Sequence, residues 1–321
     1  MTNAKTFSVR DLFNLDVPEK VVVRGFSDAN PFTPARDDDY QFRREVMSDV
    51  LAWLNFSTDP LYIRGPSGSG KSSVICQMAA RLNLGVHRVT AHSRLETPEL
   101  IGHHAIIDGD MVFIEGPLVN AMRRGEIFML DEIDLLDPAT AAGLNGVLEG
   151  AALTIPEKGG EIVRPAPGFR FVATGNTGGC GDSTGVFQGT MRQNLAFMDR
   201  FWMMEVGYPS ADEEKKILSK AAPKTPEVVR EGLIEVSNLI RKAFMGDGSS
   251  DIPPLDITVS TRSLVRWAQM CALFQGIRAQ GRNPVLHALD RAIAFKASPE
   301  SRHALHEIVQ RQMGDATPAA S

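Results

Sequence analysis

Cysteine is scarce in this chain. Only three cysteines occur among 321 residues, and Cys76, Cys180 and Cys271 lie far apart. An odd number of widely separated cysteines suits neither a disulfide framework nor a zinc site built from paired thiolates. The scarcity therefore favours a reducing compartment, and we expect the protein in the cytoplasm.

Long apolar runs are also missing. The opening MTNAKTFSVRDLF lacks the apolar segment of a signal peptide, and no window of about 18 consecutive apolar residues occurs. We therefore expect neither export nor membrane insertion. The hydrophobic content of 43% nevertheless allows a sizeable core, with room for about two compact units.

The sequence has no excess of positive charge. It carries 34 Lys and Arg against 39 Asp and Glu, which gives a formal net charge of -5. Proteins that grip nucleic-acid backbones depend on clustered Lys and Arg. A role in nucleic-acid binding is therefore disfavoured, and local basic patches stay open.

Three regions of different character follow one another. Residues 1–40 mix prolines with an acidic run, which predicts an extended arm without a core of its own. Residues 41–208 alternate strand-like and helical patterns, which predicts an α/β domain with a parallel sheet between helices. Residues 209–321 carry only amphipathic helical patterns and predict a smaller all-helical domain.

The α/β region contains a phosphate-binding motif. The stretch GPSGSGKS matches GxxxxGK[ST], with a strand-like run before it and a helical pattern after it. Glycines let backbone N–H groups converge on phosphate oxygens; Lys71 would neutralise the β- and γ-phosphates, and the Ser72 hydroxyl would bind Mg²⁺. The alternative is a glycine-rich turn with a surface lysine. The expected ATP-binding residues are Gly65, Pro66, Ser67, Gly68, Ser69, Gly70, Lys71, Ser72 and Ser73.

A pair of acids ends the apolar strand IFMLDE. Asp131 and Glu132 follow four apolar residues, and ligands of open parallel sheets gather at such carboxyl ends. Asp131 would hold Mg²⁺, and Glu132 would orient and deprotonate the attacking water. The alternative is that these acids, with Asp134 and Asp137, form a solvated charged surface.

Three further polar residues could complete a catalytic site. Asn176 ends the strand-like run FRFVATGN and could hold the nucleophilic water, although Asn at a strand end is often a turn residue. Arg200 and Arg262 could stabilise the charge that develops on the transferred phosphoryl group. Taken alone, either arginine would be assigned to a surface ion pair.

The order of these motifs resembles that of an AAA+ ATPase: GPSGSGKS, LDEID, VATGN, MDRF and then STR in the helical region. The segment ELIGHHAIIDGDMVFIEGPLVNAMRRGEIFMLDEID is similar to the MoxR branch, with an inserted hairpin that turns at Asp108 and Gly109. Within that branch the chain resembles the CobS type, the ATPase subunit of aerobic cobalt chelatases, through SVRDLF, GFSDAN, GNTGGCGDSTGVFQGTMRQN, MDRFW and KAFM.

The resemblance implies a role for each matching residue. Asn176 matches the first sensor, and Arg262 matches the second sensor, carried by the helical lid. Arg200 matches the arginine finger, which acts on the nucleotide of a neighbouring subunit, and the nearby Arg192 stays open as an alternative. Because a finger in trans requires a neighbour, a hexameric ring is implied. Lys71 with Ser72 and Asp131 with Glu132 match the Walker A and Walker B pairs.

The resemblance also implies a motor with a protein partner. Two hairpins, at residues 105–114 and 153–165, would project from the ring, and Met111, Val112 and Phe113 would face either the substrate or the underside of the hairpin. The expected partner bears a von Willebrand A domain, and ATP-dependent cobalt chelation is one form of the remodelling. A nucleic-acid motor of a mobile element and an ATP-gated scaffold without turnover stay open as alternatives.

Overall fold

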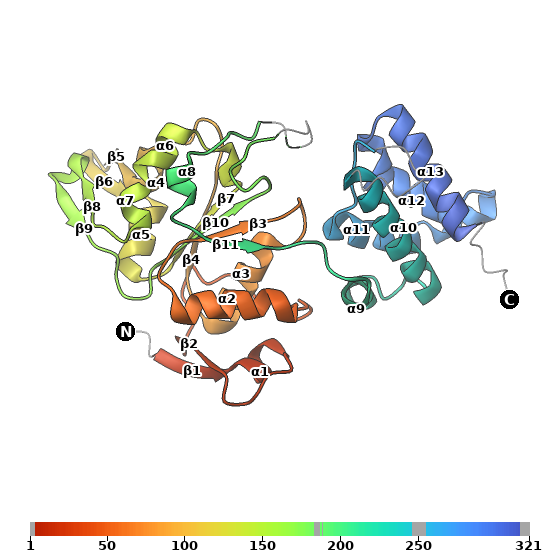
Figure 1. Cartoon of the computed structure of the whole chain (residues 1–321), viewed down its shortest axis with the longest axis horizontal. Helices are drawn as coiled ribbons and strands as arrows, with labels where there is room; N and C mark the ends of the chain where they lie inside the picture. The colour runs from red at the N-terminus through yellow and green to blue at the C-terminus, as the bar shows by residue number, and fades with distance from the viewer. Residues whose placement is uncertain (1–3, 183–186, 188, 246–254, 315–321) are drawn as a thin grey trace. The chain divides into compact units, whose positions relative to one another are not determined.

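The computed structural model describes residues 4–182, 187, 189–245 and 255–314 (Figure 1). The chain divides into two compact units, of which the first holds most of the residues up to Gly207 and the second is built mainly from Tyr208 onward. Part of the stretch GNTGGCGDSTGVFQGTMRQN, at residues 183–186 and 188, lies outside the described residues. Each unit has a hydrophobic core of its own.

The first unit is built on a parallel sheet. Its five strands lie in the order β11-β3-β10-β7-β4, and every neighbouring pair is parallel. This confirms the predicted fold class. Each strand is preceded or followed by helices that cover the sheet. The strands are β3 (Leu61–Arg64), β4 (Val86–Thr90), β7 (Ile127–Asp131), β10 (Arg170–Gly175) and β11 (Trp202–Glu205).

Both faces of this sheet are buried along its inner strand β7. All five residues of β7 are buried, but Phe128 and Leu130 belong to one core cluster, and Ile127 and Met129 to the other. Successive side chains of a strand point to opposite faces, so a continuous apolar run reflects cover on both sides. The covering helices are α2 (Arg44–Phe56), α3 (Lys71–Leu82), α4 (Thr97–Ile101), α5 (Pro117–Arg124), α6 (Pro138–Gly143), α7 (Asn145–Leu148) and α8 (Leu195–Met198), with the 3-10 helix η1 (Ile133–Leu135).

The N-terminal region is not an extended arm. It forms β1 (Ala4–Ser8), α1 (Val9–Phe13) and β2 (Val22–Phe26), and the two strands pair antiparallel. Val9, Phe13 and Val23 are buried in the same core cluster as α2 and α3. The elements are so short that their few apolar residues show no clear periodicity in the sequence, which is why the prediction was wrong here.

The two expected hairpins are present (Figure 1). The first turns at Asp108 and Gly109, whose φ angles of 52° and 93° lie in the left-handed region. Phe113 packs against the core, whereas Met111 and Val112 are exposed. The hairpins consist of β5 (Gly102–Ile107) with β6 (Asp110–Glu115), and β8 (Leu153–Ile155) with β9 (Glu161–Val163), the second pair joined through the 3-10 helix η2 (Pro156–Lys158).

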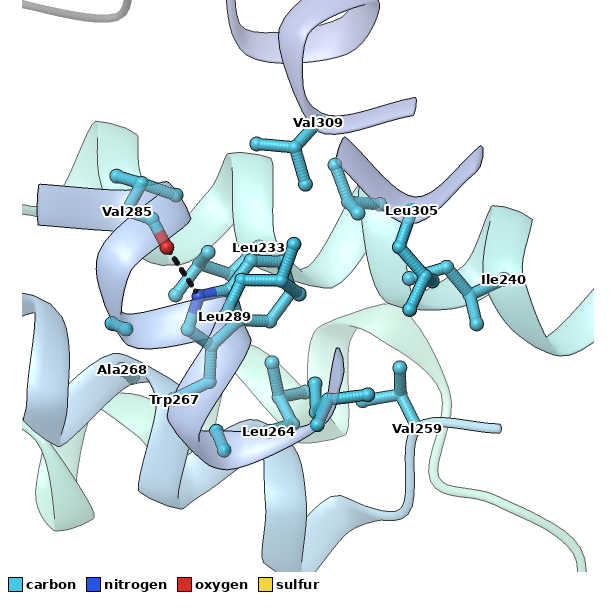
Figure 2. Packing of buried hydrophobic residues seen from close by; sticks show 14 of the residues in the cluster. Leu233, Ile240, Val259, Leu264, Trp267, Ala268, Val285, Leu289, Leu305 and Val309 are labelled. Carbon is cyan, nitrogen blue, oxygen red and sulfur yellow. Dashed lines mark hydrogen bonds between the residues drawn. The ribbon is translucent and has the colours of Figure 1, made fainter. Parts of the chain in front are cut away.

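The second unit is helical. Trp267 is fully buried at its centre and donates from Nε1 to the carbonyl oxygen of Val285 at 3.0 Å (Figure 2). Glu214 and Arg241 form a buried ion pair, with Nη2 and Oε1 2.7 Å apart. The helices are α9 (Ala211–Ala221), α10 (Glu227–Met245), α11 (Thr261–Leu273), α12 (Pro284–Ala292) and α13 (Pro299–Met313), with the 3-10 helices η3 (Gln275–Gln280) and η4 (Ala294–Lys296).

Across the described ranges, none of the helices combines the length and the apolar character that crossing a lipid bilayer requires.

Candidate functional site

The glycine-rich loop connects β3 to α3, as the motif requires. Gly68 and Gly70 have φ angles of 72° and 98°, a conformation that L side chains rarely adopt. Gly70 is the N-cap residue of α3, so the loop ends at the amino terminus of a 12-residue helix. The unpaired N–H groups and the partial positive charge of a helix N-terminus favour phosphate there.

Lys71 lies buried behind the loop, with 6% of its surface exposed. Its ammonium group donates to the carbonyl oxygen of Gly65 at 2.8 Å and to Asn176 Oδ1 at 2.7 Å. Burial lowers the pKa of Lys71, and the nearby acids Glu132, Asp134 and Asp131 oppose that shift. The acids thus partly offset the cost of burying this cation.

Asp131 ends β7 and is 2% exposed. The Ser72 hydroxyl donates to its Oδ1 at 2.6 Å, and the Thr174 hydroxyl donates to the same oxygen at 2.8 Å. Arg88 donates to the other carboxylate oxygen. The structure therefore brings the predicted pair Ser72 and Asp131 together and adds two neighbours that the sequence did not indicate.

Glu132 follows Asp131 in a left-handed conformation, with φ at 56°. The Asn176 side chain donates from Nδ2 to its Oε2 at 3.0 Å, while the Oδ1 of the same amide accepts from Lys71. Burial raises the pKa of Glu132, and the nearby Lys71 opposes that rise. A carboxylate with a raised pKa is a stronger base, which suits it to take a proton from water.

Asp134 is a component of the site that sequence reasoning did not single out. It is fully buried and accepts from the Tyr62 hydroxyl at 2.5 Å and from the backbone N–H groups of Asn176 and Thr177 at 2.6 and 2.7 Å. Burial and the nearby Asp134 carboxylate raise the pKa of Tyr62. Asp134 thus holds the backbone just after β10, where Asn176 lies. A tyrosine inside the apolar run LYI, whose buried hydroxyl needs a partner, was the available signal.

Among the described contacts of this cluster, none involves Arg200 or Arg192, the two candidate arginines of the first unit. Arg200 follows α8 and forms an ion pair with Glu149, with Nη2 and Oε1 2.5 Å apart. Arg192 is exposed, and its backbone forms an isolated bridge with Cys180. Arg262 is exposed in the first turn of α11, within the second unit. The site residues that the structure brings together are Lys71, Ser72, Asp131, Glu132 and Asn176.

Comparison with known proteins agrees with this geometry. Residues 60–201 match the AAA domain of the dynein-related subfamily, and residues 214–312 match the CbbQ/NirQ/NorQ C-terminal domain. The aerobic cobaltochelatase subunit CobS of a Sinorhizobium species is 32% identical over 296 residues, covering 89% of this chain and 86% of that protein. A Staphylococcus epidermidis protein described as uncharacterized is 31% identical over 201 residues, covering 61% of this chain and 73% of that protein.

Among solved structures, a mutant of RuvB from Thermotoga maritima aligns with a TM-score of 0.51 and 15% sequence identity, covering 81% of this chain and 73% of that chain. At this identity the likeness supports the fold alone. The long match to CobS supports more, because it spans both units. The chain belongs to the AAA+ ATPases of the MoxR type, the family that includes CobS.

Proposed function

We propose that this chain hydrolyses ATP to ADP and phosphate in a ring of identical copies and uses the cycle to remodel a partner protein complex. The observation that supports this most is the amide of Asn176, which hydrogen-bonds the ammonium of Lys71 on one side and the carboxylate of Glu132 on the other. A cation for phosphate beside a base for water is the arrangement that phosphoryl transfer to water requires.

The loop from Gly65 to Ser73 binds the triphosphate. Its backbone N–H groups and the amino terminus of α3 face the phosphates, and Lys71 neutralises their charge. Lys71 hydrogen-bonds the carbonyl oxygens of Gly65 and Pro66 at 2.8 and 3.1 Å. These partners are neutral, so charged phosphate oxygens compete well for the same protons.

Glu132 acts as the general base. It accepts the proton of the water that attacks the γ-phosphorus, and the bond from that phosphorus to the bridging oxygen of ADP breaks. Asn176 holds the Glu132 carboxylate through Nδ2 and so orients it. Burial raises the pKa of Glu132, which brings the base closer to neutral pH.

The residues present fit a magnesium ion. The Ser72 hydroxyl and the Asp131 carboxylate place two hard oxygen donors 2.6 Å apart at the start of α3 and the end of β7. Mg²⁺ takes few protein oxygens and keeps several waters. When bound, it supplies positive charge beside the β- and γ-phosphates.

Arg200 is proposed as the finger that reaches the nucleotide of the neighbouring copy, with Arg192 as the alternative, and Arg262 as the second sensor in the lid. The Arg200 side chain is 26% exposed and held by Glu149, so it is presented at the surface in a defined place. A fixed cation at a subunit boundary stabilises the charge that develops on the transferred phosphoryl group.

Mixing two inactive variants tests the shared site. Glu132→Gln removes the base of its own site, and Arg200→Ala removes the finger for the next site. Neither variant should hydrolyse ATP alone, but mixed rings should regain activity at about a quarter of the sites, where an intact base meets an intact finger. Activity is read as phosphate release. No activity in the mixture, or full activity of Arg200→Ala alone, would contradict the trans arrangement. Arg192→Ala, mixed in the same way, tests the alternative finger.

The similarity to CobS is the basis for the proposed partner protein. CobS is named as a subunit of an aerobic cobaltochelatase, so ATP-dependent cobalt chelation in the cytoplasm, with a partner that bears a von Willebrand A domain, is the specific form we propose. The Glu132→Gln protein, held with ATP, should retain its partners in a pull-down. Recovery of a von Willebrand A protein with a large chelatase subunit supports cobalt chelation, whereas recovery of DNA alone contradicts it. A parent protein without ATPase activity, even with its partner, would favour an ATP-gated scaffold.

A further inference from the structure

A large cavity lies beside the N-terminal hairpin. Its volume is about 1200 Å³, and its walls come from β1, β2, the second half of α2 and the loops that precede β7 and β10. Figure 1 shows β2 next to α2 at one edge of the first unit. The lining is largely apolar and includes Val22 and Phe56, which are 49% and 87% exposed. Exposed apolar side chains around one cavity are typical of a site of interaction.

A half-buried arginine lies in the wall of this cavity. Arg170 donates to the carbonyl oxygens of Phe169 at 2.9 Å and Leu54 at 3.3 Å. Its Nε is buried and has no hydrogen-bond partner among the described residues. Burial lowers the pKa of Arg170. Among the described residues no carboxylate pairs with Arg170, so its positive charge in the cavity wall favours an anionic ligand.

The remaining charges have the same sign. Lys20 and Arg24 also line the cavity. Among the described lining residues the one acid is Glu126, and its two oxygens are already bonded to Asn30 Nδ2 at 2.8 Å and to His87 Nε2 at 2.6 Å. The cavity therefore suits an apolar segment that carries negative charge.

The tip of the β5–β6 hairpin has that chemistry. Ile106 and Met111 face each other across the two strands and are 77% and 73% exposed. Asp108 lies in the turn and Asp110 begins β6, and residues 102–115 contain neither Lys nor Arg. The tip is thus apolar and acidic. Figure 1 places this hairpin and β2 at different edges of the first unit.

We propose that the β5–β6 tip of one copy docks into the basic apolar cavity of a second copy. The apolar side chains of the tip cover Val22 and Phe56, and its two aspartates face Lys20, Arg24 and Arg170. Because tip and cavity are different surfaces, the contact is heterologous, and it joins copies head to tail. It requires neither nucleotide nor hydrolysis, so it goes beyond the proposed ATPase cycle.

Charge reversal in the full chain tests this contact. In sedimentation velocity without nucleotide, the sedimentation coefficient of the parent should rise with protein concentration, because copies associate. Arg24→Glu and Asp110→Lys should each weaken that association about tenfold, because each places like charges together. Lys5→Glu is the matched control, since it makes the same change in the same N-terminal hairpin at an exposed residue that does not line the cavity. Its association should equal that of the parent.

Mixing the two reversed proteins makes the test specific. The Asp110→Lys tip fits the Arg24→Glu cavity, and the intact tip of the second protein fits the intact cavity of the first, so a 1:1 mixture should regain the association of the parent.

Three results would overturn the proposal: a parent that stays monomeric without nucleotide, reversed variants that associate like the parent, or a mixture that does not recover. These results leave the ATPase proposal intact, because the mixed-ring experiment with Glu132→Gln and Arg200→Ala is carried out with nucleotide and reads phosphate release.

Discussion

Glu132 combines two features that make a charged glutamate unfavourable at this position. Its backbone lies in the left-handed region, which asparagine and glycine adopt more easily, and burial raises the pKa of its carboxyl group. Neither feature helps the fold. Both place a basic carboxylate beside Asn176, which is what the proposed hydrolysis needs.

Glu132→Gln should abolish turnover and stabilise the protein. Phosphate release should fall at least about 100-fold, because the general base is lost. The folded-state pKa of Glu132 lies above its unfolded value, so the parent loses stability as pH rises through the interval between them. The free energy of unfolding of the Gln variant should therefore exceed that of the parent at pH 8, and the difference should shrink toward pH 4. Urea unfolding at both pH values measures this, and a variant less stable at pH 8 would contradict it.

Asp134→Asn should destabilise the first unit by about 2 to 3 kcal/mol, because an amide has one acceptor oxygen and cannot accept both from the N–H groups of Asn176 and Thr177, which share Oδ2, and from the Tyr62 hydroxyl on Oδ1. Asp137→Asn is the matched control. Asp137 caps α6 by accepting from Ala139 N at 2.8 Å, and asparagine caps equally well. Chemical denaturation compares the two variants, and equal stability would argue against the role of Asp134.

At the residue scale, the sequence could predict which polar side chains the structure brings together, but not all of their contacts. Lys71, Ser72, Asp131, Glu132 and Asn176 could be chosen because each follows a recognisable loop or strand. The bonds from Thr174 and Arg88 to Asp131 could not, because they depend on which strands are neighbours in the sheet. Strand order is set by packing of the whole unit and leaves no local pattern.

At the scale of elements, ion pairs link the two hairpins to each other. Glu115 at the end of β6 pairs with Arg123 of α5 at 3.0 Å and with Lys158 of η2 at 2.9 Å. Glu161 of β9 pairs with the same two cations. The four side chains tie β8 and β9 to β6 and α5, so the hairpins share one support.

Arg123→Gln should loosen the β8–β9 hairpin. Burial acts to raise the pKa of Glu115, but hydrogen bonds from Lys158 and Arg123 hold it below its usual range, and hydrogen bonds from Arg123 and Lys158 lower the pKa of Glu161. The network therefore stabilises the folded hairpins above the ordinary glutamate pKa of about 4.3, and this contribution is lost as pH falls through the lowered values.

Amide hydrogen exchange over residues 153–163 at pH 7 measures the effect. The Arg123→Gln protein should exchange faster there than the parent, while Arg164→Gln, an exposed arginine beside the same hairpin, should not. Equal exchange in the Arg123→Gln protein and the parent would show that the ion pairs do not hold the hairpin.

Element prediction succeeded where apolar residues are periodic or a turn is specified. The inner strand β7 begins with a continuous apolar run, and Asp108 with Gly109 marks a hairpin turn. The prediction failed for the N-terminal region, because its short elements are stabilised by contacts distant in the sequence. Val9, Phe13 and Val23 share a core cluster with residues of α2 and α3.

At the scale of the whole molecule, the chain has separate cores. The cluster around Trp267 contains residues of the second unit alone, and the two clusters of the first unit lie on the two faces of its sheet. Each unit therefore has the buried apolar surface to unfold as a cooperative body of its own.

Trp267→Ala should destabilise the second unit selectively, by about 3 to 5 kcal/mol, because it leaves a cavity at the centre of that core. Differential scanning calorimetry should show one transition shifted to lower temperature and the other unchanged. Trp202→Ala, at a tryptophan of the first unit that is 37% exposed, is the control and should leave the second-unit transition in place. A joint shift of both transitions by Trp267→Ala would mean that the units unfold together.

The amide of Asn176 has a direction. Its oxygen accepts from the Lys71 ammonium, and its nitrogen donates to the Glu132 carboxylate. Rotating the amide by half a turn would set two donors against each other at Lys71 and two acceptors against each other at Glu132. Aspartate would keep the contact with Lys71 but set two anions against each other at Glu132, and leucine would keep the shape but lose both contacts. Neither isosteric replacement thus preserves the site: aspartate adds a repulsion, whereas leucine removes both hydrogen bonds.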